Sequence, residues 1–406
     1  MACLVVQLCV GILYLWSAFK GNIVAAYSVG MDDAAKAGVS SAATMVSSYM
    51  IFAFVFGNLI GGFLNDKKGP KFTCFAGVIL FSAGVAVSAF VKTIALLDFT
   101  YAIMAGLGSG FAYGACISCI QKWLPHKRGL ASGLACSAFG LSTVVFTPVS
   151  NMLMEANKNA EGIVNFTPVF LTLAGVFAVL GLIACCFISL PDDEYIKSLN
   201  LPKAAASTNQ NYTLGQAIKV PAFWCLFFSI FFINGTWNLC VPLIKDLGEQ
   251  RGLTTAMALA CVSFTGITNA AGRLIMASLS DKIGRINTLT LVFIIAIAAL
   301  MALYACGEGS VVLFYIGICL IGVCFGAFMG IYPGFTADNF GTKNSSVNYG
   351  IMFFGFSAAG LIGPQIMSSI YKSSGAYQPA FLVAAVMAVV GLALSFVYRA
   401  VYKRSH

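Results

Sequence analysis

The chain has 406 residues, of which 59% are hydrophobic and 9% are charged, and its mean hydropathy is +0.90. A soluble protein of this length carries about 25% charged residues, so the composition excludes a soluble globular domain. The formal net charge of +9 is explained by an uneven distribution of basic residues over the loops and gives no argument for a nucleic-acid partner.

Apolar runs of 18 or more residues recur from one end of the chain to the other, and each can cross a hydrocarbon core about 30 Å thick. We therefore predict an all-α, polytopic membrane protein. Its twelve transmembrane spans are expected at residues 2–19 (or to 29), 41–64, 72–91, 96–120, 130–153, 166–190, 219–243, 254–279, 287–306, 311–337, 347–371 and 377–399.

The basic residues predict the orientation of these spans. The loops after the even-numbered spans and the C-terminal tail hold fifteen Lys and Arg, whereas the opposite side holds seven. Basic loops stay in the cytoplasm, so both termini are expected there. The first span lacks a preceding basic segment, which favours a true span over a cleaved signal peptide. We expect a multi-pass protein of the plasma membrane, or of the inner membrane if the source is bacterial, bound to lipid and able to act as a monomer.

The cysteines and histidines do not favour a redox site or a metal site. All fourteen cysteines fall in predicted spans, and Cys116 and Cys119 form a C-x-x-C. Inside a membrane helix this spacing puts two small polarizable side chains on one face, which favours packing of reduced thiols over a redox role. The two histidines, His126 and His406, lie in a loop and at the terminus. We therefore expect no metal site and no cofactor.

The chain repeats itself. Asp66 in the segment after the second span and Asp281 in the segment after the eighth are 215 positions apart. Gly110 and Gly114 match Gly326 and Gly330 at 216 positions, and such glycines permit close contact between helices. The repeat predicts two parallel six-helix halves, an N-terminal bundle at 1–190 and a C-terminal bundle at 218–406, joined by a flexible polar linker at 191–217.

Arg273 is the most informative single residue. It lies in the otherwise apolar or weakly polar span 254–279, eight residues before Asp281, which is roughly 12 Å along a helix and therefore near the middle of the bilayer. No acidic residue is near it in sequence, and an arginine at this depth costs from about 2.5 to more than 10 kcal/mol. A transported anion is the simplest compensating group. Backbone carbonyls or Asn side chains are the structural alternative.

The segment Gly62-Phe-Leu-Asn-Asp66-Lys-Lys-Gly69-Pro-Lys71 and its copy around Asp281 resemble the signature loops of the major facilitator superfamily. The resemblance covers essentially the whole chain. It implies transport by two parallel halves that rock about a central site. The aspartate can cap a neighbouring helix while the basic residues bridge to helix ends, which would make these loops a conformational gate. The gating residues expected are Gly62, Asp66, Gly69, Lys71, Asp281, Gly284 and Arg285.

Further segments are similar to the oxalate/formate antiporter family, which is related to the monocarboxylate transporters. They are Tyr14-Leu-Trp16-Ser17, the run from Lys122 to Gly133 (KWLPHKRGLASG), Asn348-Tyr349-Gly350 and Gly363-Pro364. In that family the arginine of the eighth span binds the substrate carboxylate, so the resemblance and the membrane argument agree on Arg273.

The resemblance also suggests the other substrate-binding residues, each with a packing alternative. Tyr14 and Tyr113 are phenols that could donate to a carboxylate. Phe328 and Tyr332 are four residues apart on one helix face and are expected to form a wall. The weaker candidates, for which helix packing is the alternative, are Phe356, Trp16, Asn269, Asn348 and Trp237.

Two departures from the family pattern bear on the cargo. Phe356 stands where oxalate-exchanging members have a lysine, so one arginine is left to match one carboxylate. A dicarboxylate would leave a charge unneutralised at low dielectric, which predicts a small monocarboxylate such as lactate, pyruvate or formate. Asn269 stands where proton-coupled relatives have an aspartate. We therefore expect anion exchange, with proton-coupled symport or oxalate:formate antiport as alternatives.

Other classes of function fit less well. A transporter-like membrane sensor would be expected to add a soluble output domain, and neither terminus nor the linker is long enough for one. An enzyme would need a nucleophile, a metal or an acid/base set, and no H-E-x-x-H, G-x-S-x-G or carboxylate cluster occurs in the sequence. The sequence thus predicts a transporter and no enzyme.

Overall fold

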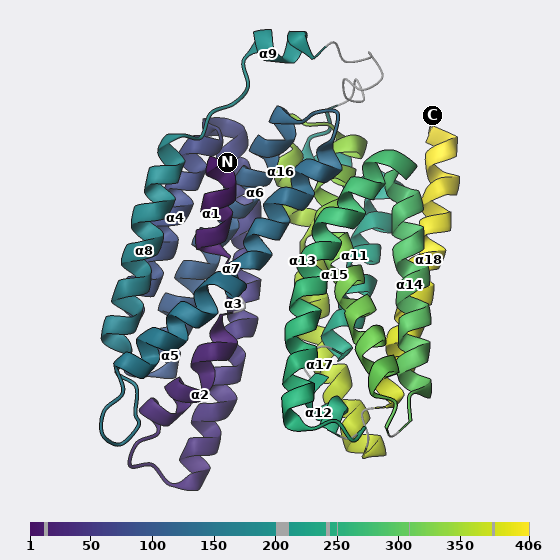
Figure 1. Cartoon of the computed structure of the whole chain (residues 1–406). Coiled ribbons are helices and arrows are strands. Elements are labelled where there is room, and N and C mark those ends of the chain that lie inside the picture. Colours follow the sequence, from purple (N-terminus) through teal and green to yellow (C-terminus); the bar gives the residue numbers. More distant parts are fainter. Residues whose placement is uncertain are drawn as a thin grey trace. The chain divides into compact units, whose positions relative to one another are not determined.

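The structure is a computed structural model that describes residues 1–11, 15–199, 211–240, 244–249, 251–307, 309–375 and 378–405. Helices make up nearly all of this part (Figure 1), and the only β pairing within it is an isolated bridge between Lys158 and Val164. The expectation of an all-α protein is confirmed. Ten stretches of the described chain are long and apolar enough to cross a membrane, one of them, Asp33–Ser88, holding two consecutive helices.

The chain divides into two compact units. The first comprises Met1–Trp123, Ala138–Pro202 and Lys343–Ile351, and the second comprises Leu124–Ser137, Lys203–Thr342 and Met352–His406. Two helices therefore contribute residues to both units: α7 (Arg128–Ala156) and α16 (Ser345–Met352).

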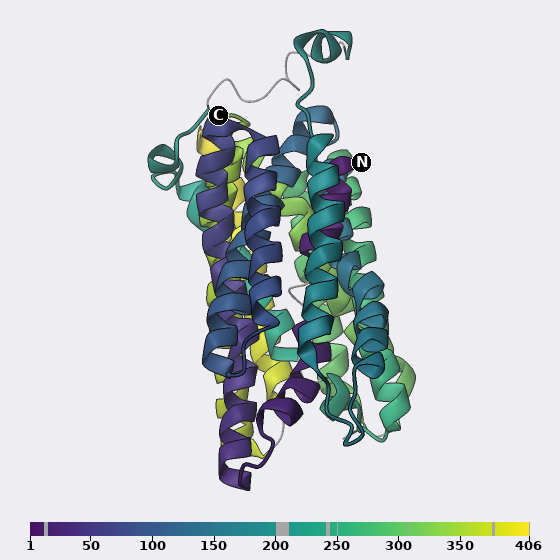
Figure 2. The same ribbon diagram turned by 90° about the vertical axis from the view of Figure 1, so that its left-hand side faces the viewer.

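The first unit is built on long, nearly parallel helices. Figure 1 shows α1, α4 and α8 side by side, and Figure 2 shows the same helices from the side. The elements are α1 (Ala2–Val10), α2 (Trp16–Tyr27), α3 (Asp33–Lys68), α4 (Pro70–Ser88), α5 (Ile94–Leu97), a π-helical turn (Asp98–Met104), α6 (Ala105–Trp123), α8 (Phe166–Cys186) and the short α9 (Asp193–Ser198). The first predicted span is thus two helices, α1 and α2, and residues 12–14 between them are outside the described part.

The second unit repeats this architecture. Its elements are α10 (Leu214–Ala217), α11 (Pro221–Cys240), α12 (Ile244–Glu249), α13 (Thr255–Ile283), α14 (Arg285–Ala305), α15 (Val311–Phe340), α17 (Phe354–Ser374) and α18 (Pro379–Ser405). Within it α13 packs along α15, and α11 packs along α17 and α18. Of the predicted linker 191–217, the described ends contain α9 and α10, whereas residues 200–210 are outside the described part.

The repeated loops have the same local geometry in both units. Gly69 ends α3 with φ +84° and Gly284 ends α13 with φ +90°. Only glycine adopts this conformation without a steric penalty. The next helix then begins at once, at Pro70 and at Arg285 respectively. Glycine at these two positions therefore allows two long helices to be joined by a single residue.

Candidate functional site

Arg273 is buried in the second unit, with 1% of its surface exposed. Its Nε donates to Oδ1 of Asn269, one turn earlier on α13, at 3.0 Å. Its Nη1 donates to the backbone carbonyl of Cys136 on α7 at 2.6 Å. These two bonds fix the plane of the guanidinium group. An Asn side chain and a backbone carbonyl are the two kinds of partner expected from the structural alternative for Arg273, although the sequence did not indicate that Cys136 supplies the carbonyl.

The positive charge of Arg273 has no carboxylate partner among the residues that the structure describes. The ion pairs formed by arginines within that part involve Arg128 and Arg285, which lie in the loop network described below. A guanidinium has five N–H donors, and the bonds to Asn269 and Cys136 use two of them. The remaining hydrogens, one on Nη1 and two on Nη2, form the fork that binds a carboxylate end-on with two parallel bonds.

Glycines enclose the backbone of the turn that carries Arg273. A Cβ at Gly326 of α15 would overlap the carbonyl oxygen of Asn269, and one at Gly330 would overlap the carbonyl oxygen of Arg273. On the α7 side, a Cβ at Gly133 would lie 2.6 Å from that same Arg273 oxygen. Since any larger residue would push the helices apart, these glycines determine how closely α13 is held.

Four of the predicted aromatic residues come together elsewhere in the second unit. Trp237 of α11 stacks on Phe325 at 4.1 Å between ring centroids, Phe325 contacts Phe328 at 5.2 Å, and Phe328 contacts both Phe356 at 6.0 Å and Tyr332 at 5.9 Å. We call these five residues the aromatic cluster. It joins α11, α15 and α17, and it places Phe356 in apolar surroundings.

Two buried polar residues next to the aromatic cluster were missed by the sequence analysis. Asn234 of α11 donates from Nδ2 to the carbonyl of Phe356 at 2.7 Å, while its Oδ1 has no hydrogen-bond partner among the described residues. The hydroxyl of Ser357 is likewise buried without a partner in the described part of the chain. Buried polar atoms are usually paired, so these two are candidates for contact with water or cargo. The sequence signal that could have indicated Asn234 is an amide side chain within an otherwise apolar predicted span.

The remaining predicted binding residues lie in the first unit. Tyr113 is fully buried on α6, with its ring 5.1 Å from that of Phe54 and 5.0 Å from that of Phe139. Trp16 donates from its indole nitrogen to the carbonyl of Ala43 at 2.8 Å, so its polar edge is engaged within the protein. Asn348 is buried on α16. Tyr14 lies outside the described residues.

The loop copy in the second unit forms a charge network. The carboxylate of Asp281 accepts the backbone N–H groups of Gly129 and Leu130, at 2.9 and 2.8 Å, at the start of α7. Arg285 pairs with Asp281 at 2.6 Å and with Asp338 at 2.9 Å, and Arg128 pairs with Asp338 at 2.8 Å. Asp281 therefore caps a helix N-terminus, as the spacing suggested, while Arg128 and Asp338 complete a chain of four charges.

The loop copy in the first unit caps a helix in the same way but is paired differently. The carboxylate of Asp66 accepts a hydrogen bond from the backbone N–H of Val347, in the first turn of α16. Neighbouring contacts come from Asn65, whose Nδ2 donates to Ser346 Oγ at 2.8 Å, and from Lys71, whose ammonium donates to the carbonyl of Cys186 at 2.8 Å. A Cβ at Gly62 would lie 2.8 Å from the carbonyl carbon of Ser346, so glycine is required for this approach. The two copies thus share a backbone geometry but differ in their charge pairing.

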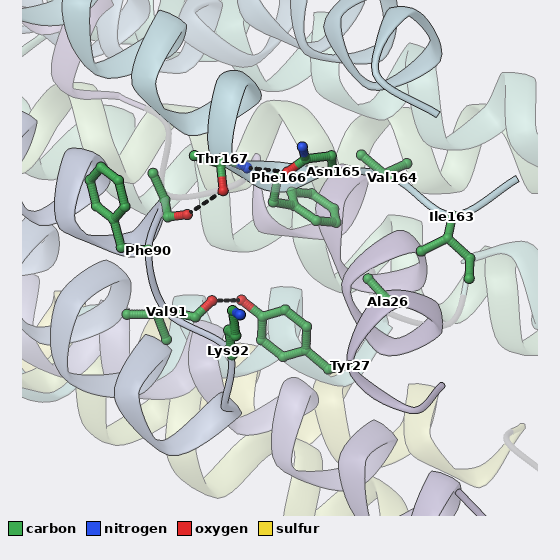
Figure 3. Close-up of a pocket in the computed structure, with 11 residues that line it drawn as sticks. Ala26, Tyr27, Phe90, Val91, Lys92, Ile163, Val164, Asn165, Phe166 and Thr167 are labelled. Atoms are coloured by element: carbon green, nitrogen blue, oxygen red, sulfur yellow. Dashed lines mark hydrogen bonds between the residues drawn. The ribbon is translucent and has the colours of Figure 1, made fainter. Parts of the chain in front are cut away.

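A cavity of about 410 Å³ opens at the other end of the first unit. It lies where α2 and α4 end and α8 begins, and Figure 3 shows Tyr27 donating to the carbonyl of Val91, and Thr167 donating to that of Ala89, beside it. Its single charged lining residue is the exposed Lys92. None of the predicted binding residues that the structure describes lines this cavity.

The repeated helical units, the repeated glycine-ended loops and the buried arginine define a multi-pass membrane transporter. Comparison with known proteins places it in a family. Residues 8–364 match the Major Facilitator Superfamily, and the chain belongs to that superfamily. It is a transporter and not an enzyme.

Similar proteins include the oxalate:formate antiporter of Oxalobacter formigenes, 27% identical over 82% of this chain and 77% of the relative. Monocarboxylate transporter 12 of Xenopus laevis is 23% identical over 80% of this chain and 73% of the relative. Among solved structures, the Major Facilitator Superfamily transporter FucP in the outward conformation superimposes with a TM-score of 0.72 over 98% of this chain and 97% of FucP, at 13% identity. This structural similarity confirms the expected fold.

Proposed function

We propose that the protein is a secondary active transporter that carries small monocarboxylate anions, such as lactate, pyruvate or formate, by alternating access. The observation that carries the proposal is Arg273, a buried guanidinium that is oriented by Asn269 and Cys136 and has no carboxylate partner among the described residues. A bound carboxylate would neutralise this charge and accept the two remaining parallel hydrogen bonds. Two of the similar proteins are named for carboxylates, one as an oxalate:formate antiporter and one as a monocarboxylate transporter, and these names support the same class of cargo.

The aromatic cluster favours a cargo with one carboxylate group over a cargo with two. Phe356, at the place where oxalate-exchanging relatives have a lysine, is 4% exposed and stacks on Phe353 at 4.7 Å. A second carboxylate beside these rings would lose its hydration without gaining a cation. We propose that Phe328, Tyr332 and Phe356 form an apolar wall of the binding region. Antiport of oxalate and formate is the second candidate, favoured by the similarity to the Oxalobacter antiporter.

The amide side chain of Asn269 supports anion exchange over proton-coupled symport. With Asn269 in place of an acid, no titratable carboxylate lies one turn from Arg273. An empty carrier would have to carry an uncompensated buried cation through its cycle, which costs several kcal/mol. We therefore propose that anion travels in both directions. Proton-coupled symport is the alternative, because a proton could travel with the anion.

The remaining assignments are also proposals. Tyr113, Tyr14, Trp16, Asn348 and Trp237 are candidate contacts to the cargo, and the two loop copies are candidate gates. The excess of basic residues in the loops supports a plasma-membrane protein with both termini in the cytoplasm, and the proposed mechanism needs no second copy of the chain.

Binding of cargo to purified protein tests the arginine directly. We expect formate or lactate to raise the melting temperature of wild-type protein in detergent, and to leave that of Arg273→Ala unchanged. The matched control is Arg399→Ala, which removes a partly buried arginine of the second unit that bonds Thr290 through Nη2 at 3.1 Å. A cargo-dependent shift that survives in Arg273→Ala would overturn the proposal.

A further inference from the structure

Four cysteines from three helices converge in the first unit. The Sγ atoms of Cys74 on α4 and Cys116 on α6 are 3.5 Å apart. The thiol of Cys3, near the start of α1, lies within interaction distance of both Cys116 and Cys119. Cys74 and Cys116 are completely buried, Cys119 is 2% exposed and Cys3 is 6% exposed. The sequence drew attention only to the C-x-x-C of Cys116 and Cys119, whereas the contacting pair joins two helices.

The packing of α4 against α6 explains why this pair is so close. A Cβ at Gly77 of α4 would lie 2.7 Å from the carbonyl of Gly108 and 2.9 Å from the nitrogen of Ala112 on α6. Because the helices are antiparallel, the position one turn before Gly77 faces the position one turn after Ala112. These positions hold Cys74 and Cys116. The glycine contact thus brings the two backbones near enough for short side chains to touch.

Two thiols in this arrangement need little movement to form a bond. Sulfur atoms 3.5 Å apart are in van der Waals contact, and a disulfide bond of about 2.05 Å requires them to approach by roughly 1.5 Å, which side-chain rotation can supply. Among the described residues no group of Cys, His, Asp and Glu is arranged to hold a metal ion. Thiol oxidation is therefore the chemistry that this geometry favours.

We propose that Cys74 and Cys116 form an oxidisable dithiol, and that its oxidation by a peroxide ties α4 to α6 covalently. One cysteine, as its thiolate, attacks a peroxide oxygen, becomes a sulfenic acid and releases hydroxide, which takes up the proton lost from the thiol and leaves as water. The second thiol then attacks that sulfur, and the sulfenic oxygen leaves as a second water. In total, the two thiols lose two protons and two electrons, and these reduce one hydrogen peroxide to two waters.

The crosslink would act on two helices, one that follows the Asp66 loop and one that leads into the segment of Arg128. α4 begins at Pro70, directly after the loop that holds Asp66, and α6 ends at Trp123, directly before the segment that holds Arg128. Cys74 lies one turn after Pro70 and Cys116 lies two turns before Trp123, so a covalent bond between them restrains both ends. We expect the oxidised protein to transport more slowly than the reduced protein, and to recover after treatment with dithiothreitol.

The experiment exposes purified full-length protein to hydrogen peroxide, alkylates the remaining thiols and maps the peptides by mass spectrometry. The expected result is a Cys74–Cys116 crosslinked peptide, lighter than the two reduced peptides by the mass of two hydrogens and absent after reduction. The melting temperature should rise by about 5 °C or more on oxidation. Cys74→Ser and Cys116→Ser should each abolish both effects. Cys240→Ser, a fully buried cysteine of the second unit, is the matched control and should abolish neither.

Peptide mapping needs no substrate, so it distinguishes failure of this site from failure of the proposed function. If Cys74 and Cys116 are both recovered as alkylated thiols, or Cys116 is found joined to Cys3 instead, the assignment of the pair is wrong. If the crosslink forms but labelled formate uptake is the same before and after oxidation in liposomes that show uptake, the proposed restraint on transport is wrong.

Discussion

The contact between α3 and α6 in the first unit and that between α13 and α15 in the second are built in the same way. A Cβ at Gly110 would meet the carbonyl oxygen of Phe54 and the nitrogen of Asn58. A Cβ at Gly326 would meet the carbonyl oxygen of Asn269 and the nitrogen of Arg273. Each pair of corresponding residues on the facing helices is 215 positions apart. The repeat seen in the loops therefore extends into the helices, and Asn58 is the counterpart of Arg273.

The two regions differ in the side chains that lie at these matching helix contacts. Asn58 is neutral and fully buried, and neither Nδ2 nor Oδ1 has a hydrogen-bond partner in the described part of the chain. Arg273 is charged and donates to the amide of Asn269, which occupies the position that corresponds to Phe54 of the first unit. Common glycines thus determine the packing, whereas one substitution gives a single unit the cation. We infer that the helix packing is shared between the halves and that the buried cation is not.

The largest effect is expected from removing the cation. Arg273→Ala should reduce uptake of labelled formate or lactate into liposomes by at least about 100-fold, and Arg273→Lys should fail as well, because an ammonium cannot form two parallel bonds with a carboxylate. Asn58→Ala, at the counterpart position, should retain most of the activity. Equal loss in the Asn58 and Arg273 variants would contradict the asymmetry.

The matching helix contacts predict that equivalent glycine substitutions destabilise the two units to a similar extent. Gly326→Ala and Gly110→Ala each force a methyl group against a backbone carbonyl of the facing helix, which should cost about 1–3 kcal/mol. Melting temperatures measured in detergent should fall for both variants, with Gly266→Ala as the control, since nothing lies within 4 Å of a Cβ at that position. Destabilisation in one half only would show that the two contacts are not equivalent.

Asn269 should contribute less than Arg273, because it orients the cation without carrying charge. Asn269→Ala removes the bond to Nε and should weaken binding of cargo by about 10-fold. Asn269→Asp places a carboxylate beside the arginine, so the internal pair competes with the cargo. Uptake by this variant should improve as the pH falls and the new acid is protonated. A pH profile identical to that of wild type would count against this geometry.

The smallest expected effect concerns the choice of cargo. Phe356→Lys adds a second cation beside the aromatic cluster and should raise the affinity for oxalate relative to formate by several-fold, as charge complementarity requires. Competition of unlabelled oxalate with labelled formate measures the ratio in both proteins. Phe356→Leu, which adds no charge, should leave the ratio unchanged. If the parent protein already prefers oxalate, the placement of Phe356 is wrong.

The sequence was informative wherever the pattern is local or repeated. Hydropathy predicted the helical membrane fold, and the spacing of Asp66 and Asp281 revealed the repeat. Contacts between distant segments could not be predicted in this way. Cys136 bonds Arg273 across 137 positions, and Cys74 meets Cys116 across 42. Such pairs depend on which faces of the helices meet, a property that single-sequence periodicity does not specify.

The most direct test of the account is counterflow in liposomes. Wild-type protein is reconstituted into vesicles that contain unlabelled formate or lactate, or no carboxylate, and uptake of the labelled anion is followed with the pH gradient collapsed by an ionophore. Exchange driven by neutralisation of Arg273 predicts rapid uptake only into the preloaded vesicles. Uptake into empty vesicles that follows an inward proton gradient, with no stimulation by internal anion, would contradict exchange and establish proton-coupled symport.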